Sequence, residues 1–130
     1  MSINYSVQVE KYAERHYLKK FSKKYKSAWD ITWRAIVGEF KRLDSLFSTS
    51  IAETIVDSEN IMIVKSEFRV AGTKESRKAS GNRCIIAVRK NTKTVCVLLV
   101  YHKNDIGDGN ETAHWRGVIK ENYTEYRNLL

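Results

Sequence analysis

The first 50 residues show first the period of a strand and then the period of helices. Residues 3–9 alternate between apolar and polar side chains, which predicts a short strand. Residues 11–25 repeat apolar side chains at helical spacing, with lysines between them. Residues 27–47 continue this spacing in steps of four and three, at Trp29, Trp33, Ile36, Phe40, Leu43 and Phe47. We predict a helical hairpin with buried aromatic stripes, whose second helix begins with a capping box of Ser27 and Asp30.

The remainder of the chain predicts three strands and one more helix. Residues 61–70, 83–89 and 94–101 have the composition and alternation of strands, and the last of these is apolar on both faces, which favours a place inside the sheet. The polar segments 72–82 and 104–110 contain glycines and predict loops. A final helix begins at residue 111, with apolar positions at Trp115, Val118, Ile119 and Tyr123 and the same spacing extended by Tyr126, Leu129 and Leu130.

The predicted fold class is α+β, with a small, mainly antiparallel sheet of about four strands and helices packed on one face. The elements follow the order strand, helix, helix, three antiparallel strands, helix. A length of 130 residues suits one compact domain, residues 1–130, and no repeat or linker divides it. Cys84 and Cys96 fall in neighbouring strands, so we interpret them as small core residues rather than a redox pair.

Composition excludes several classes of protein. The sequence contains no run of 18 apolar residues, so it predicts no membrane span. The N-terminus also lacks the pattern of a signal peptide. We therefore expect a cytoplasmic protein without membrane contact. Two cysteines and the scattered His16, His102 and His114 predict no metal site. Phosphate-loop, zinc-protease and nucleophile-elbow motifs are also absent from the sequence. We therefore expect chemistry, if any, that needs neither metal nor cofactor.

The net charge of +8 is concentrated in two segments. Residues 11–26 contain seven Lys or Arg and one acid, and residues 69–93 contain eight and one. Clustered positive charge indicates a surface that binds a polyanion such as nucleic acid. A charge-rich, solvated face has the same composition, so charge alone leaves both interpretations open.

Alternation along residues 61–70, the first of the three predicted strands, predicts where part of this positive charge lies. If helices cover its apolar side, then Lys65, Glu67 and Arg69 face the open side of the sheet. The next strand can add Arg83 and Arg89 to the same face. The expected result is a groove with one carboxylate and several cations.

The end of the last strand adds Tyr101, His102 and Lys103 at the rim of this groove. A carboxylate, an imidazole and several cations suit RNA cleavage. A base takes the proton of a ribose 2′-hydroxyl, cations stabilise the phosphorane, and an acid protonates the leaving 5′-oxygen. The simpler alternative is that Glu67 forms a cross-strand ion pair and that His102 is an ordinary surface histidine.

Three segments carry a family resemblance. Lys65–Val70 alternates polar and apolar residues, Ser80–Val88 contains a glycine shortly before the arginine that opens a strand, and Val95–Asp105 is an apolar strand that ends in basic and aromatic residues. In these segments and in the order of elements, the chain resembles the RelE/ParE superfamily of bacterial type II toxins, and in particular its RelE-like mRNA interferase branch.

The resemblance implies an endoribonuclease that cleaves mRNA on the ribosome, with Glu67 as general base, Arg83 as the cation that stabilises the transition state, and His102 as general acid. It implies that other side chains bind RNA: Lys65, Arg69, Arg77, Lys78, Arg89, Lys103, Tyr123 and Tyr126. It also implies a cognate antitoxin with an acidic, partly disordered segment, mRNA and the ribosome as partners, and a monomeric toxin on its own. A ParE-like topoisomerase inhibitor and a non-catalytic nucleic-acid-binding module are the alternatives.

Overall fold

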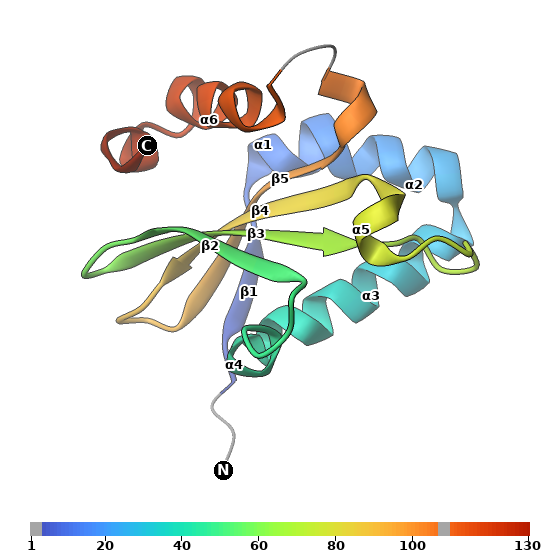
Figure 1. Cartoon of the computed structure of the whole chain (residues 1–130), viewed down its shortest axis with the longest axis horizontal. Coiled ribbons are helices and arrows are strands. Elements are labelled where there is room, and N and C mark those ends of the chain that lie inside the picture. Colours follow the sequence, from blue (N-terminus) through green and yellow to red (C-terminus); the bar gives the residue numbers. More distant parts are fainter. Residues whose placement is uncertain (1–3, 107–109) are drawn as a thin grey trace.

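A five-stranded mixed sheet forms the centre of the computed structural model, which describes residues 4–106 and 110–130 (Figure 1). The sheet has the order β1-β5-β4-β3-β2. Its strands are β1 (Ser6–Val9), β2 (Ala52–Asp57), β3 (Ile61–Phe68), β4 (Asn82–Arg89) and β5 (Thr94–His102). β1 pairs in parallel with β5, and the other neighbours are antiparallel. The α+β class and the mainly antiparallel sheet are confirmed, and Ile3 of the predicted first strand lies outside the described residues.

The predicted helical hairpin is also confirmed. Its first arm is one continuous helix, composed of α1 (Lys11–Ala13), a π-helical segment (Glu14–Leu18) and α2 (Lys19–Tyr25). Its second arm comprises α3 (Ser27–Lys41) and the short α4 (Leu43–Leu46). The rings of Phe21 and Trp29 stack between the arms, with centroids 4.7 Å apart. The aromatic stripes therefore form core, as their spacing indicates.

The expected sheet of about four strands is wrong by one, because β2 was not predicted. This edge strand pairs antiparallel with β3, and its register shifts between Thr54 and Val56. A bulge places one extra residue in a strand and breaks the two-residue alternation from which a strand is recognised in sequence. The apolar residues Ile55 and Val56 are therefore adjacent in the sequence. Residues 52–57 show clearly neither the alternation of a strand nor the spacing of a helix.

The expectation that helices cover one face of the sheet is also wrong. One core cluster lies against α2, α3 and α4 and contains Phe21, Trp29, Phe40, Val64, Phe68 and Val97. A second cluster lies against α6 (Glu111–Asn122) and the following 3-10 helix (Thr124–Leu129) and contains Ile63, Leu99, Trp115, Ile119 and Tyr126. Figure 1 shows α3 and α6 on opposite sides of the sheet. On the face that contains the second cluster, Lys65 and Glu67 of β3 are only partly buried.

The junction of the hairpin does not use the predicted capping box. Lys26 alone links α2 to α3, with a positive φ of 51°, and no side chain caps α3. The N–H of Lys26 donates to the carbonyl of Ser22, and its own carbonyl accepts from Trp29. Backbone groups thus satisfy both helix ends, so Ser27 and Asp30 are not needed as caps.

The connector 72–82 contains a helical turn, α5 (Arg77–Ser80), that positions the start of β4. The hydroxyl of Ser76 accepts a hydrogen bond from the N–H of Ala79, and Gly81 ends the turn with a left-handed φ of +80°. The predicted loop 104–110 begins with a 3-10 helix (Lys103–Ile106), and residues 107–109 lie outside the described residues.

Both cysteines are buried core residues, as predicted, Cys84 in the first cluster and Cys96 in the second. In the ranges that the structure describes, no helix is long and apolar enough to cross a bilayer.

Candidate functional site

Four charged side chains and one tyrosine meet on the face that α6 partly covers. Lys65 and Glu67 lie on β3, and Glu67 is paired across the ladder with Arg83 of β4. Arg83 is paired in turn with Tyr101 of β5. Glu111, the first residue of α6, lies over this group and contacts it directly. The alternation of β3 therefore placed Lys65 and Glu67 on the correct face.

The carboxylate of Glu111 occupies the position where an anion from a ligand would bind. The hydroxyl of Tyr101 donates to Glu111 Oε2 at 2.7 Å. The same oxygen lies 3.1 Å from Nζ of Lys65 and 3.9 Å from Nε of Arg83. Burial raises the pKa of Glu111, but the hydrogen bonds from Tyr101 and Lys65 and the nearby positive charges outweigh it, so the net pKa lies below its ordinary value. Glu111 is therefore ionised at neutral pH.

Arg83 is a buried and fixed cation, with 7% of its surface exposed. Its guanidinium donates to the carbonyls of Asn82 at 3.0 Å and Lys78 at 3.3 Å. Nη1 of Arg83 also lies 3.3 Å from Oε2 of Glu67. Within the described part of the chain, that buried oxygen receives no aligned hydrogen bond. The carboxylate of Glu67 is thus held by the charge of Arg83 rather than by an aligned hydrogen bond.

A cleft of about 410 Å³ opens beside these side chains. Three cations and two carboxylates line it, together with the segment that enters β2: Lys65, Lys78, Arg83, Glu53, Glu67 and residues 50–52. A cleft with this lining suits a phosphodiester, because cations can neutralise the phosphate while a carboxylate accepts a proton.

His102 does not join this group, although sequence reasoning placed it with Glu67 and Arg83. Its ring packs over Gly81 and lines a pocket on the opposite face of the sheet, and its Nδ1 accepts from the N–H of Asn104 at 3.1 Å. Arg83 pairs with Tyr101, so the next residue along β5 points the other way.

A bulge explains this correction. Arg89 pairs with Thr94, and a regular ladder counted from that pair would match Arg83 with Val100 and place His102 on the same face as Arg83. The register shifts between Ile85 and Ile86, which inserts one extra residue into β5. The extra residue exchanges the two faces for the rest of β5, so Tyr101 takes the place predicted for His102.

Two of the predicted RNA-binding arginines lie elsewhere, on the side of the sheet that α3 covers. Arg77 forms an ion pair with Glu39 of α3 at 2.7 Å. Arg69 lies beyond the end of β3, and its guanidinium donates to the carbonyl of Glu75 at 3.3 Å. Both line a groove beside α3. Lys78 does line the candidate cleft, and Lys103 is exposed just after β5.

The remaining predicted contacts belong to the core. Arg89 lies at the far end of β4 and donates to the hydroxyl of Tyr126 at 3.0 Å. The hydroxyl of Tyr123 donates to the carbonyl of Leu98 at 2.8 Å. Tyr123 is 4% exposed and Tyr126 is fully buried, so neither ring presents a face to a base. These tyrosines instead fasten the C-terminal segment to the sheet.

Glu111 is the site residue that sequence reasoning missed, since it served only to mark the start of a helix. Tyr101 was placed at the rim of the groove, at the end of an apolar strand, but was given no role. Tyr101, Glu111 and their partners lie on different elements of the fold, so no spacing along the chain reveals that they meet. A polar hydroxyl at the end of an otherwise apolar strand was the one available signal for Tyr101.

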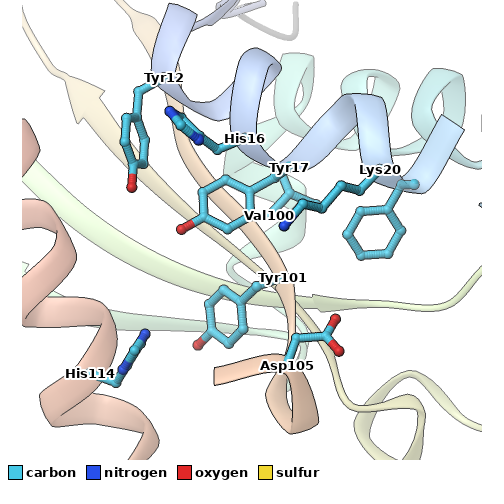
Figure 2. A pocket seen from close by; sticks show the side chains of 9 residues that line it. Tyr12, His16, Tyr17, Lys20, Val100, Tyr101, Asp105 and His114 are labelled. Carbon is cyan, nitrogen blue, oxygen red and sulfur yellow. The ribbon is translucent and has the colours of Figure 1, made fainter. Parts of the chain in front are cut away.

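A second and larger cavity has a volume of about 570 Å³ (Figure 2). It lies between the N-terminal helix, the end of β5 and α6, and nine residues line it: Tyr12, His16, Tyr17, Lys20, Phe21, Val100, Tyr101, Asp105 and His114. Tyr101 links it to the charged group, because Tyr101 lines the cavity while its hydroxyl contacts Glu111.

Comparison with known proteins identifies the fold. No family model matches the sequence, and no curated protein matches it. A chain in the crystal structure of the archaeal RelE–RelB complex from Pyrococcus horikoshii OT3 aligns with a TM-score of 0.50 and 13% identity, covering 78% of this chain and 96% of that chain. This chain has a RelE-like fold. The RelE-like fold expected from the three resembling segments is thereby confirmed, and at this identity the likeness describes the fold alone.

Proposed function

We propose that this protein is the toxin of a type II toxin–antitoxin pair and that it cleaves RNA through the ribose 2′-hydroxyl, without a metal. The observation that carries the proposal is the buried Arg83 beside the partly exposed Glu67, with Lys65 in the same cleft. The RelE-like fold supports it. The Glu67 side chain lines the cleft and is 18% exposed, so its carboxylate can act as a general base toward a ligand in the cleft.

Glu67 accepts the proton of the 2′-hydroxyl, and the 2′-oxygen then attacks the phosphorus. Arg83 and Lys65 stabilise the charge on the phosphorane. Tyr101, rather than His102, donates the proton to the leaving 5′-oxygen. Burial and the hydrogen bond to Glu111 raise the pKa of Tyr101 well above its ordinary value, which makes its hydroxyl a weaker acid, so this transfer requires the phosphate to displace Glu111 first. The products are a 2′,3′-cyclic phosphate and a free 5′-hydroxyl.

Substitutions at the cleft test this proposal. We expect Arg83→Ala to reduce cleavage on the order of 10²–10³-fold, because a cation at the developing charge is lost. Glu67→Gln, which retains shape but not basicity, should reduce it by about 10²–10⁴-fold. His102→Ala is the matched control on the opposite face and should keep cleavage near wild type. Cleavage of purified RNA and growth arrest on expression are the two readouts, with thermal unfolding to verify folding.

The same experiment separates the alternatives. If the Arg83 and Glu67 variants cleave RNA and arrest growth as wild type does, this active site is wrong. A DNA-damage response with intact mRNA would favour a topoisomerase inhibitor with the same fold. Normal growth under strong expression would favour a non-catalytic nucleic-acid-binding protein. Cleavage of mRNA with and without translating ribosomes would show whether the ribosome is a partner.

We also propose an antitoxin partner with an acidic, partly disordered segment. The solved structure with the similar fold is a complex of RelE with RelB. In this chain, Glu111 shows that a carboxylate fits among Lys65, Arg83 and Tyr101. An acidic side chain of a partner can bind there in the same way. Co-expression with the product of a neighbouring acidic reading frame should restore growth, and failure to copurify with any such product would contradict the proposal.

A further inference from the structure

The larger cavity is not used by the proposed reaction, yet it has the form of a binding site. Its volume of about 570 Å³ falls within the range of small-ligand pockets. Figure 2 shows the side chains of Tyr17 and Tyr101 extending into it from the N-terminal helix and from β5, with His114 at its edge. His16, Lys20 and His114 are exposed residues, so their side chains are accessible to a ligand.

The lining favours a flat ring with hydrogen-bonding edges. The rings of Tyr12 and His16 lie with centroids 4.4 Å apart, and Tyr17 meets Tyr12 edge-on at 5.9 Å. Such a wall of rings stacks well on a nucleobase. Lys20 and Asp105 carry opposite charges, so the cavity, unlike the cleft, does not favour a bare anion. Hydroxyl, imidazole and carboxylate groups can pair with the edge of a base.

Tyr101 connects the cavity to the phosphate site. Its ring lines the cavity, and its hydroxyl contacts Glu111, which in turn contacts Lys65. Two side chains in contact, Tyr101 and Glu111, thus lie between the cavity and the cations of the cleft. We propose that the cavity binds the nucleobase that adjoins the phosphate held by Lys65 and Arg83. This inference rests on the proposed function of the cleft and adds to it a subsite that selects single-stranded RNA by its base.

A ligand that cannot be cleaved tests the subsite independently of catalysis. The probes are a 2′-O-methyl trinucleotide and three analogues, each lacking one base. Wild type should bind the intact trinucleotide about tenfold more tightly than one of the abasic analogues, the size expected for one stacked base. In the double variant His16→Ala/Tyr17→Leu this ratio should fall to near one. Arg15→Ala, an exposed position on the same helix outside the cavity lining, should keep it.

A second measurement on wild type needs no variant. The imidazole NMR signals of His16 and His114 should shift with adenosine 5′-monophosphate and much less with ribose 5-phosphate, which lacks the base. Equal shifts with both would show an anion site and overturn the inference. So would a tenfold ratio that survives in the double variant.

The outcomes separate the subsite from the proposed nuclease. Loss of the base-dependent ratio in the double variant, in a protein that proves not to cleave RNA, supports the subsite and rejects the nuclease. Cleavage that depends on Arg83, combined with a ratio that the double variant leaves unchanged, supports the nuclease and rejects the subsite.

Discussion

Glu111 is the residue whose carboxylate lies among two cations and a hydroxyl, those of Lys65, Arg83 and Tyr101. Under the proposed function, a phosphate that reaches these cations must displace this carboxylate. Part of the binding free energy of RNA would then be spent on breaking the contacts of Glu111. An intramolecular anion of this kind lowers affinity for every competing anion, whether it is a phosphate or a partner's carboxylate.

We predict that Glu111→Gln binds uncleavable RNA more tightly. Removing one negative charge from the site should raise affinity about fivefold, which corresponds to ~1 kcal/mol for a partly exposed ion pair. Glu121→Gln removes the same charge from an exposed position on the same helix and should change affinity little. Fluorescence anisotropy at fixed salt measures both. Equal gains in the two variants would point to net charge rather than to displacement.

Glu111 should also make stability depend on acidity. Because its folded pKa lies below the ordinary value, ionised Glu111 stabilises the fold above that ordinary range, and the contribution is lost as pH falls through the folded pKa. We expect Glu111→Gln to be less stable than wild type at pH 7 by at most about 1 kcal/mol, with the difference shrinking as pH falls below 4.5. Urea unfolding at several pH values gives the comparison. A difference that is constant with pH would contradict the assignment.

The turn between α5 and β4 is the element that aligns the site. Gly81 ends α5 with a φ of +80°, and a Cβ added there would lie 2.7 Å from Nε2 of His102. The turn leads directly to Arg83 at the start of β4. The guanidinium of Arg83 donates a hydrogen bond to the carbonyl of Lys78 in α5. The ring of His102 packs beneath this turn, on the face opposite the site.

We predict that Gly81→Ala destabilises the protein by ~1–3 kcal/mol, from backbone strain together with contact against the ring. Gly72→Ala is the matched control, because Gly72 also has a positive φ of 88° but a Cβ there would meet nothing within 4 Å. The double variant Gly81→Ala/His102→Ala should recover the steric part. Urea unfolding measures all three. Equal losses for Gly81→Ala and Gly72→Ala would show that the ring contact is unimportant.

At the scale of the whole molecule, tyrosines join the second core to the C-terminal segment. Tyr123 and Tyr126 bind Leu98 and Arg89 of the sheet, and Tyr12 packs edge-on against Tyr123 with centroids 5.7 Å apart. Burial raises the pKa of Tyr126 to about 12, and it also raises the pKa of Tyr101 and Tyr123. The folded molecule thus contains several phenols that resist ionisation.

We predict that stability falls as pH rises above 10, the ordinary pKa of tyrosine. The folded pKa values are raised, so the unfolded chain loses protons first and unfolding becomes more favourable with each unit of pH. Urea unfolding should show this loss between pH 9 and pH 11, while tyrosinate absorbance should rise together with unfolding. In the variant Tyr126→Phe, stability should depend less on pH over this range. Tyrosinate absorbance that rises fully in the folded protein at pH 10 would contradict the prediction.

Much of this molecule follows from local periodicity. The spacing of apolar residues determined the helical hairpin, the three antiparallel strands and the start of α6, because each element must bury one side of itself. The same alternation determined that Lys65 and Glu67 share a face of β3. The concentration of positive charge near Arg83 was also visible in the sequence.

Only the tertiary structure decided which groups meet. One bulge in β2 removed the alternation that identifies a strand, and another in β5 exchanged the faces of Tyr101 and His102. A bulge is set by pairing with a neighbouring strand, so the sequence of a single strand does not reveal it. The placement of Glu111 depends on how α6 packs across the sheet. Periodicity reports which residues share a face of one element, whereas the register between elements depends on contacts far apart in the chain.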